Sequence, residues 1–179
     1  MRDGEKSAEP RVASCAEAYA ETVRMNGFPD FSCPPGPAIA RDGRGKPYFP
    51  SAPGLHFSLT HSGEYGACAF FTQPVGLDLQ SHTRCRKEAI ARRFFHPEEY
   101  AYLEEKGFEP FFQVWTSKES YLKYTGAGFA GGLRTFSVAD DGGLKAKAEG
   151  VEFYRREWPE GYSLCLCAET IPEVRCRCL

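Results

Sequence analysis

The amino-acid sequence predicts an α+β fold of two pseudo-symmetric lobes, each a helix packed on a small antiparallel sheet. Apolar and polar residues alternate in two groups of short segments, at 55–80 and 133–168, as they do in half-buried strands. A helical pattern at 14–26 precedes the first group, and helical patterns between 84 and 128 separate the two groups. Turns that contain Gly or Pro divide the strands, as expected of antiparallel meanders. This order of elements is typical of α+β proteins.

Composition excludes several classes of protein. The 179 residues, 42% of them apolar, suit one domain or two small lobes that share a core. A net charge of −2 does not fit a polycation that binds nucleic acid. No apolar run approaches the ~18 residues of a membrane span, and the polar N-terminus lacks an apolar signal core. We therefore expect a cytoplasmic protein, active as a monomer.

Eight cysteines are scattered along the chain without a Cys-x-x-Cys pair. Reduced, partly buried thiols are the favoured interpretation. A soft-metal site built from the last four cysteines is a less favoured alternative.

The individual elements follow from local patterns. Residues 14–26 are predicted to form a helix that ends at Gly27, and 28–37 an irregular connection. Three strands come next, expected as one antiparallel meander, with Leu55, Phe57 and Leu59 on the same face. The remaining elements are a basic helix at 84–94, a helix from Pro97 to about Glu105, the helical segment 111–128, and strands near 133–139, 144–154 and 162–168.

The helical segment at 111–128 organises the rest of the chain. Pro110 suits its start, and Gly126 and Gly128 suit its end. Its apolar stripe consists of Phe111, Val114, Trp115 and Leu122. Lys118 lies inside this stripe, where a lysine is costly unless it finds a partner. Glu119 and Lys123, spaced i and i+4, lie side by side at the edge of the stripe.

Two sets of polar residues could carry chemistry. Asp78 on a strand and Glu119 on a helix, with lysines nearby, would suit Mg²⁺ that bridges phosphates, if the fold brings them together; otherwise they are solvated charges. Lys46, the Thr60-His61-Ser62-Gly63 turn, Lys118 and Lys123 could bind an anion. His61 alone would more often be a structural histidine, and no Walker loop or GxGxxG motif is present.

A third set is basic: Arg84, Arg86, Lys87, Arg92 and Arg93, opposed only by Glu88. This run is either a solvated helix face or a docking patch for an acidic partner.

Four segments together resemble the Sfp-type 4'-phosphopantetheinyl transferases: GKPYF (45–49), FSLTHSG (57–63), VGLDLQ (75–80) and FFQVWTSKESYLKYTGAGF (111–129). The last contains the family pattern Trp-x-x-Lys-Glu-x-x-x-Lys, and the order and spacing of all four agree. The segment RRFFHPEEYAYL (92–103) is similar to the element that the family places before this helix.

The resemblance implies two lobes, 1–76 and 77–179, with coenzyme A in the cleft between them. It also implies an enzyme that transfers 4'-phosphopantetheine from coenzyme A to a serine of an acidic acyl or peptidyl carrier protein. The resemblance implies that Mg²⁺ is bound by Asp78, Glu119 and Gln80, and that catalysis depends on Asp78, Glu119 and Lys123. It implies that coenzyme A is bound by Lys46, Pro47, Thr60, His61, Ser62, Lys118 and Lys123. The basic residues 84–93 would then receive the carrier protein.

Two departures from the family pattern stand out. Many members carry a glutamate where this chain has Gln80, so the metal would gain an oxygen ligand without charge. The first lobe is expected to be shortened, because segments that usually precede its helix are missing. A non-catalytic module that binds coenzyme A or a carrier protein is therefore the alternative; a generic Mg²⁺-dependent nucleotide hydrolase is weaker, because no phosphate loop is present.

Overall fold

A computed structural model describes residues 39–128, 132–171 and 173–174. The predicted helix at 14–26, the connection at 28–37 and the last two cysteines lie outside these residues. The described strands are β1 (Ala40–Arg41), β2 (Pro47–Tyr48), β3 (His56–Ser62), β4 (Tyr65–Phe71), β5 (Val75–Ser81), β6 (Ala139–Asp140), β7 (Gly143–Leu144), β8 (Lys147–Ala148), β9 (Val151–Glu157) and β10 (Tyr162–Ala168). The described helices are α2 (Lys87–Phe94), α3 (Pro97–Glu105) and α4 (Phe111–Thr125).

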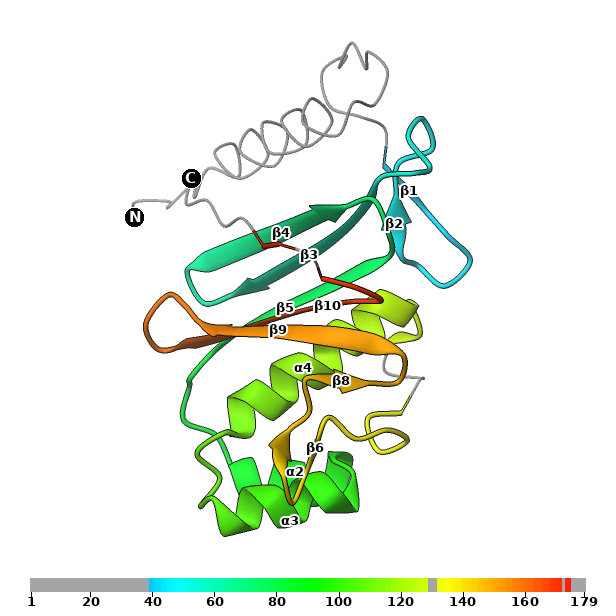
Figure 1. The fold of residues 1–179 in the computed structure, drawn as a ribbon. Helices are drawn as coiled ribbons and strands as arrows, with labels where there is room; N and C mark the ends of the chain where they lie inside the picture. The colour runs from blue at the N-terminus through cyan, green and yellow to red at the C-terminus, as the bar shows by residue number, and fades with distance from the viewer. Residues whose placement is uncertain (1–38, 129–131, 172, 175–179) are drawn as a thin grey trace, which may run out of the picture.

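The molecule is a mixed α+β structure with small antiparallel sheets, as predicted. The largest sheet has the order β5-β10-β9-β8, and β3 and β4 form a separate hairpin. In Figure 1 this hairpin lies along β5 on one side of the sheet, and α4 lies on the other side, with α2 and α3 beyond it. None of the helices in the described ranges combines the length and the apolar character that a membrane crossing requires.

The predicted meander of three strands is wrong at its third strand. β5 pairs with β10, from Val75↔Ala168 to Ser81↔Tyr162, and not with β4. The reason lies in β3, whose polar face is buried against β5. Ser58, Thr60 and Ser62 are buried, whereas on the apolar face Phe57 is buried and Leu59 is 46% exposed. The three hydroxyls accept hydrogen bonds from the β5 amides, so side chains of β3 cover the edge of β5 where a backbone ladder was expected.

The second group of strands also differs from the prediction. Of the predicted 133–139 strand, Ala139 alone lies in a strand, as the first residue of β6, and the predicted 144–154 strand is broken into β7, β8 and the start of β9. Glu149 and Gly150, both with positive φ, separate β8 from β9. The strand at 162–168 is confirmed as β10.

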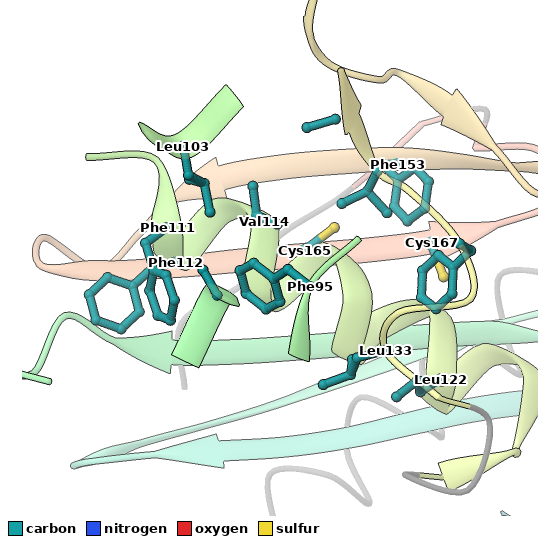
Figure 2. Close-up of a cluster of buried hydrophobic side chains, with 14 of the residues drawn as sticks. Phe95, Leu103, Phe111, Phe112, Val114, Leu122, Leu133, Phe153, Cys165 and Cys167 are labelled. Carbon is teal, nitrogen blue, oxygen red and sulfur yellow. The ribbon is translucent and has the colours of Figure 1, made fainter. Parts of the chain in front are cut away.

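Helix α4 forms as predicted and carries the main core. Gly126 ends it in the left-handed conformation, with φ of 69°. Phe111, Val114 and Leu122 are buried, and Figure 2 shows them with Phe95 from the α2–α3 connection and Cys165 from β10. At roughly 25 cal/mol per Å² of apolar surface removed from water, this burial stabilises the packing of α4 within the main core cluster.

The opposite face of α4 approaches β5 very closely at Gly76. A Cβ added there would overlap the carbonyl oxygen of Ser120 and lie 2.6 Å from the backbone nitrogen of Tyr124. Only glycine leaves room for this approach. It places the α4 residues between Ser120 and Tyr124 directly against the strand that carries Asp78.

Candidate active site

Asp78 lies in the middle of β5 and is only 6% exposed. Its Oδ1 atom accepts a hydrogen bond from Lys123 Nζ at 2.7 Å and one from Thr60 Oγ1 at 3.2 Å. Asp78 Oδ2 is buried and has no hydrogen-bond partner within the described ranges. Burial raises the pKa of Asp78, and the contacts with Lys123 and Thr60 oppose that increase. The two oxygens of one carboxylate thus have different surroundings.

Lys123 reaches Asp78 of β5 from α4, and Glu119 lies one helical turn before it, near enough for the Asp78 charge to affect its pKa. Glu119 Oε1 is buried and, in the part of the chain that the structure describes, no donor contacts it. Burial raises the pKa of Glu119 to about 7; the charge of Asp78 adds to the increase and that of Lys123 opposes it. Because the charge of Asp78 contributes to the raised pKa of Glu119, the two carboxylates are electrostatically coupled.

Two buried carboxylate oxygens without donors fit a divalent cation. Mg²⁺ takes oxygen ligands and is commonly held by one or two carboxylates, with water and phosphate oxygens completing its coordination. Among the described residues no group of three or more His, Cys, Asp or Glu side chains could hold a metal. The donor set therefore suits Mg²⁺ shared with a phosphate ligand better than an all-protein metal cage.

Gln80 follows Asp78 by two residues on β5 and is half-buried. Its Nε2 atom donates to the carbonyl oxygen of Ser81 at 3.3 Å. The amide adds no negative charge to the pair of carboxylates, so this edge of the site is neutral.

The Thr-His-Ser segment ends β3 beside β5. Thr60 and Ser62 are buried and accept hydrogen bonds from the backbone amides of Leu79 and Ser81, at 3.2 and 2.9 Å. The side chain of His61 is exposed. Of these three residues, His61 alone presents its side chain to solvent.

Lys46 reaches the far end of α4. Its Nζ atom donates to the carbonyl oxygen of Tyr124 at 2.6 Å, and Pro47 follows it in β2. Lysine in this position satisfies a free carbonyl at a helix C-terminus. Lys46 thereby connects the β1–β2 segment to the helix end that carries Lys123.

Lys118 lies in a different place from the other predicted site residues. It is fully buried and forms an ion pair with Glu99 of α3, with 2.6 Å between Nζ and Oε1. Burial lowers the pKa of Lys118, and the facing carboxylate opposes this. This buried position does not favour the expected contact of Lys118 with coenzyme A. Lys118 instead connects α4 to α3.

Glu99 was missed by the sequence analysis. It accepts from Lys118 Nζ, from the backbone amide of Val138 at 2.8 Å and from that of His96 at 2.9 Å. His96 and Glu99 form a capping box at the start of α3. The spacing of His96 and Glu99 was the available signal for the cap, but nothing in it indicated the ion pair with Lys118.

The basic residues gather on the exposed side of α2. Arg86, Lys87, Arg92 and Arg93 line a shallow depression there, together with Glu88 and Ala89. Arg92 is paired with Glu88 at 2.7 Å, and the aromatic ring of Phe94 is 40% exposed nearby in sequence. Arg84 is exposed before the helix begins.

An acidic pair beside a lysine, on a strand and a helix held in close contact, is chemically suited to a phosphate ester bound with a divalent cation. Residues 74–167 match the 4'-phosphopantetheinyl transferase superfamily, and this chain belongs to that superfamily. All the residues of the acidic site fall within the matched segment.

Individual relatives agree with this assignment. A 4'-phosphopantetheinyl transferase of Bacillus subtilis is 37% identical over 134 residues, covering 69% of this chain and 59% of that protein. The 4'-phosphopantetheinyl transferase Sfp of B. subtilis strain 168 is 34% identical over 136 residues, with the same coverage, 69% and 59%. A transferase of Aneurinibacillus migulanus is 33% identical over 123 residues, 64% of this chain and 52% of that protein. The chain thus spans between half and three fifths of the length of these relatives.

Proposed function

We propose that this protein transfers the 4'-phosphopantetheine group of coenzyme A to a serine of an acyl or peptidyl carrier protein, releasing adenosine 3',5'-bisphosphate. Relatives named for this activity support the proposal. The observation that carries it is the pair of buried oxygens without donors, Asp78 Oδ2 and Glu119 Oε1, beside Lys123. This arrangement suits a pyrophosphate bound with Mg²⁺.

The residues would divide the chemistry as follows. Asp78 and Glu119 would hold Mg²⁺, with the Gln80 amide oxygen as a neutral further ligand; when bound, the ion would neutralise charge on the pyrophosphate. Lys123 would donate to a pyrophosphate oxygen. Glu119 would accept the proton of the carrier serine, directly or through a water.

The transfer itself exchanges the phosphoanhydride bond of the coenzyme A pyrophosphate for a phosphoester bond to the carrier serine. The serine oxygen of the carrier forms a bond to the β-phosphorus of coenzyme A, and the bond from that phosphorus to the bridging oxygen of the pyrophosphate breaks. The leaving group, adenosine 3',5'-bisphosphate, takes the electron pair. No nucleophilic serine is needed on the enzyme.

We further propose that the nucleotide lies at the ends of β3 and β2, in a cleft between lobes 1–76 and 77–179. The exposed His61 is suited to contact the 3'-phosphate. The surrounding wall would be formed by Thr60, Ser62, Lys46 and Pro47. The polar groups of Thr60, Ser62 and Lys46 already form hydrogen bonds within the protein, so these residues would shape the wall more than bind the ligand.

The test is incubation with coenzyme A, Mg²⁺ and several apo carrier proteins, followed by mass spectrometry of the carriers. We expect a phosphopantetheine adduct on at least one carrier. Asp78→Asn and Glu119→Gln should abolish transfer, whereas Glu105→Gln, an exposed acid on α3, should not. Coenzyme A binding without an adduct on any carrier would favour the alternative, a non-catalytic binding module of the same fold.

The carrier would dock on the basic face of α2. Carrier domains are usually acidic, and rim charges of opposite sign speed association. The double variant Arg86→Glu/Lys87→Glu should raise the KM for the carrier several-fold and leave the KM for coenzyme A unchanged. Lys147→Glu, on β8, is the control for a change in overall charge. Equal effects on both KM values would remove this docking surface.

A further inference from the structure

Three hydroxyls of β3 cover the free edge of β5. The backbone amides of Leu77, Leu79 and Ser81 donate to the hydroxyl oxygens of Ser58, Thr60 and Ser62, at 3.0, 3.2 and 2.9 Å respectively. Both strands contribute every second residue, because alternate side chains and alternate amides point to the same side of a strand. Side chains thus take the place of a neighbouring backbone along this edge.

Thr60 differs from the other two hydroxyls in its second contact. A hydroxyl has one hydrogen to donate and lone pairs that accept. The Thr60 oxygen accepts from Leu79, and its hydrogen is directed to Asp78 Oδ1, 3.2 Å away. Ser62 uses its second contact on the hydroxyl of Ser81, at 3.3 Å. Thr60 therefore links the β5 backbone to the carboxylate of the acidic site.

This link distinguishes the two oxygens of Asp78. Thr60 and Lys123 both donate to Oδ1, while Oδ2 is buried with no donor within the described ranges. If Lys123 moves to a phosphate, Thr60 still holds Oδ1. A β-branched side chain restricts χ1, so threonine fixes the direction of this hydroxyl better than an unbranched residue would.

We propose that Thr60 is a positioning residue of the metal site, which turns Asp78 so that Oδ2 is the oxygen presented to the cation. The proposal rests on the proposed function, because it assumes that Asp78 and Glu119 hold Mg²⁺. In this role Thr60 orients the Asp78 carboxylate, which is distinct from the contact with coenzyme A that the sequence predicts. Residues that orient metal ligands typically change metal affinity by about 10–100-fold when removed.

Direct binding of Mn²⁺, a spectroscopic substitute for Mg²⁺, tests the proposal without reference to activity. In electron paramagnetic resonance titrations, Thr60→Val should weaken Mn²⁺ binding by about 10-fold or more. Thr60→Ser, which keeps the hydroxyl, should restore most of the affinity. Ser58→Ala is the matched control: it removes the same kind of bond to β5 at a residue that does not contact Asp78, so its Mn²⁺ affinity should stay within about 2-fold of the unmodified protein.

Urea unfolding of each variant separates a folding defect from a loss of metal binding. If Thr60→Val does not fold, Thr60→Ala is compared with Ser58→Ala, which loses an equivalent hydrogen bond. The positioning role of Thr60 would be overturned if Thr60→Val, or Thr60→Ala in its place, bound Mn²⁺ as tightly as the unmodified protein. It would also be overturned if Ser58→Ala weakened Mn²⁺ binding equally. Neither result would contradict the proposed function. Absence of both Mn²⁺ binding and phosphopantetheine transfer in the unmodified protein would overturn the proposed function, and this inference with it.

Discussion

The buried ion pair between Lys118 and Glu99 makes a quantitative prediction about stability. Both side chains are fully buried. Lys118→Met removes the ammonium group and keeps a long, unbranched side chain of similar volume. The Glu99 carboxylate would keep its hydrogen bonds from the Val138 and His96 amides but lose its counter-charge.

The size of the effect follows from what remains buried. Removing one partner of a buried ion pair costs about 3–5 kcal/mol, because an uncompensated charge stays in the interior. Lys118 also donates to the carbonyl oxygen of Phe136 at 2.7 Å and lies 4.1 Å from the centre of that ring, so these contacts are lost as well. We therefore expect the free energy of unfolding to decrease by about 3 kcal/mol or more, the cost of leaving one buried charge without its partner.

Urea unfolding followed by fluorescence measures this loss, and the midpoint should fall by roughly 1–3 M. Lys106→Met removes an exposed pair with Glu105 and should leave the unfolding free energy nearly unchanged, because solvent screens such a pair. Adding Glu99→Gln to Lys118→Met should recover part of the loss, since neither buried charge then remains. If Lys118→Met costs no more than Lys106→Met, the ion pair does not anchor α4 and our reasoning is wrong.

Three further predictions concern the strand and helix that carry the acidic site. Gly76→Ala should destabilise the protein by several kcal/mol, as judged by urea unfolding, because its Cβ would overlap the Ser120 carbonyl; a loss below about 1 kcal/mol would show that α4 can shift. Glu119 has a folded pKa of about 7 against an ordinary value of 4.5, so the folded state holds this proton more tightly and stability falls as pH rises from about 4.5 to about 7. In EDTA, the loss of unfolding free energy between about pH 4.5 and 7 should be smaller in Glu119→Gln by roughly 1–2 kcal/mol, a figure reduced because solvent screens this half-buried group. An unchanged pH profile would contradict the shifted pKa. Gln80→Glu should lower the Mg²⁺ concentration needed for half-maximal transfer, and an unchanged or higher requirement would show that Gln80 does not face the metal.

Residues with a local signature were predictable from the sequence. Pro110, Gly126 and the apolar spacing between them defined α4, and the i, i+4 spacing placed Glu119 beside Lys123. The closeness of Asp78 to Lys123 depends on Gly76, which lets the helix approach the strand. A glycine in a strand permits such an approach but does not say which element makes it.

Pairings between distant segments were less predictable for a physical reason. Alternation in β3 was recognised, but it fixes only that two faces differ. Which face is buried depends on the neighbour, and here the neighbour is a strand edge whose amides need acceptors. Ser58, Thr60 and Ser62 meet that need, and an apolar residue such as Leu59 could not. In the same way, Lys118 was recognised as costly in an apolar stripe, but its partner Glu99 lies 19 residues away on another helix.

The hydroxyls along β5 also affect how the protein can be shortened for experiments. The segment that matches the superfamily, 74–167, begins one residue before β5 and does not include β3. A fragment cut at this boundary would present three amides without acceptors on a largely apolar strand. An exposed strand edge of this kind can pair with a strand of another chain and so promotes aggregation. Expression boundaries should therefore include the β3–β4 hairpin, because the stretch that identifies the family is shorter than the stretch needed to seal its sheet.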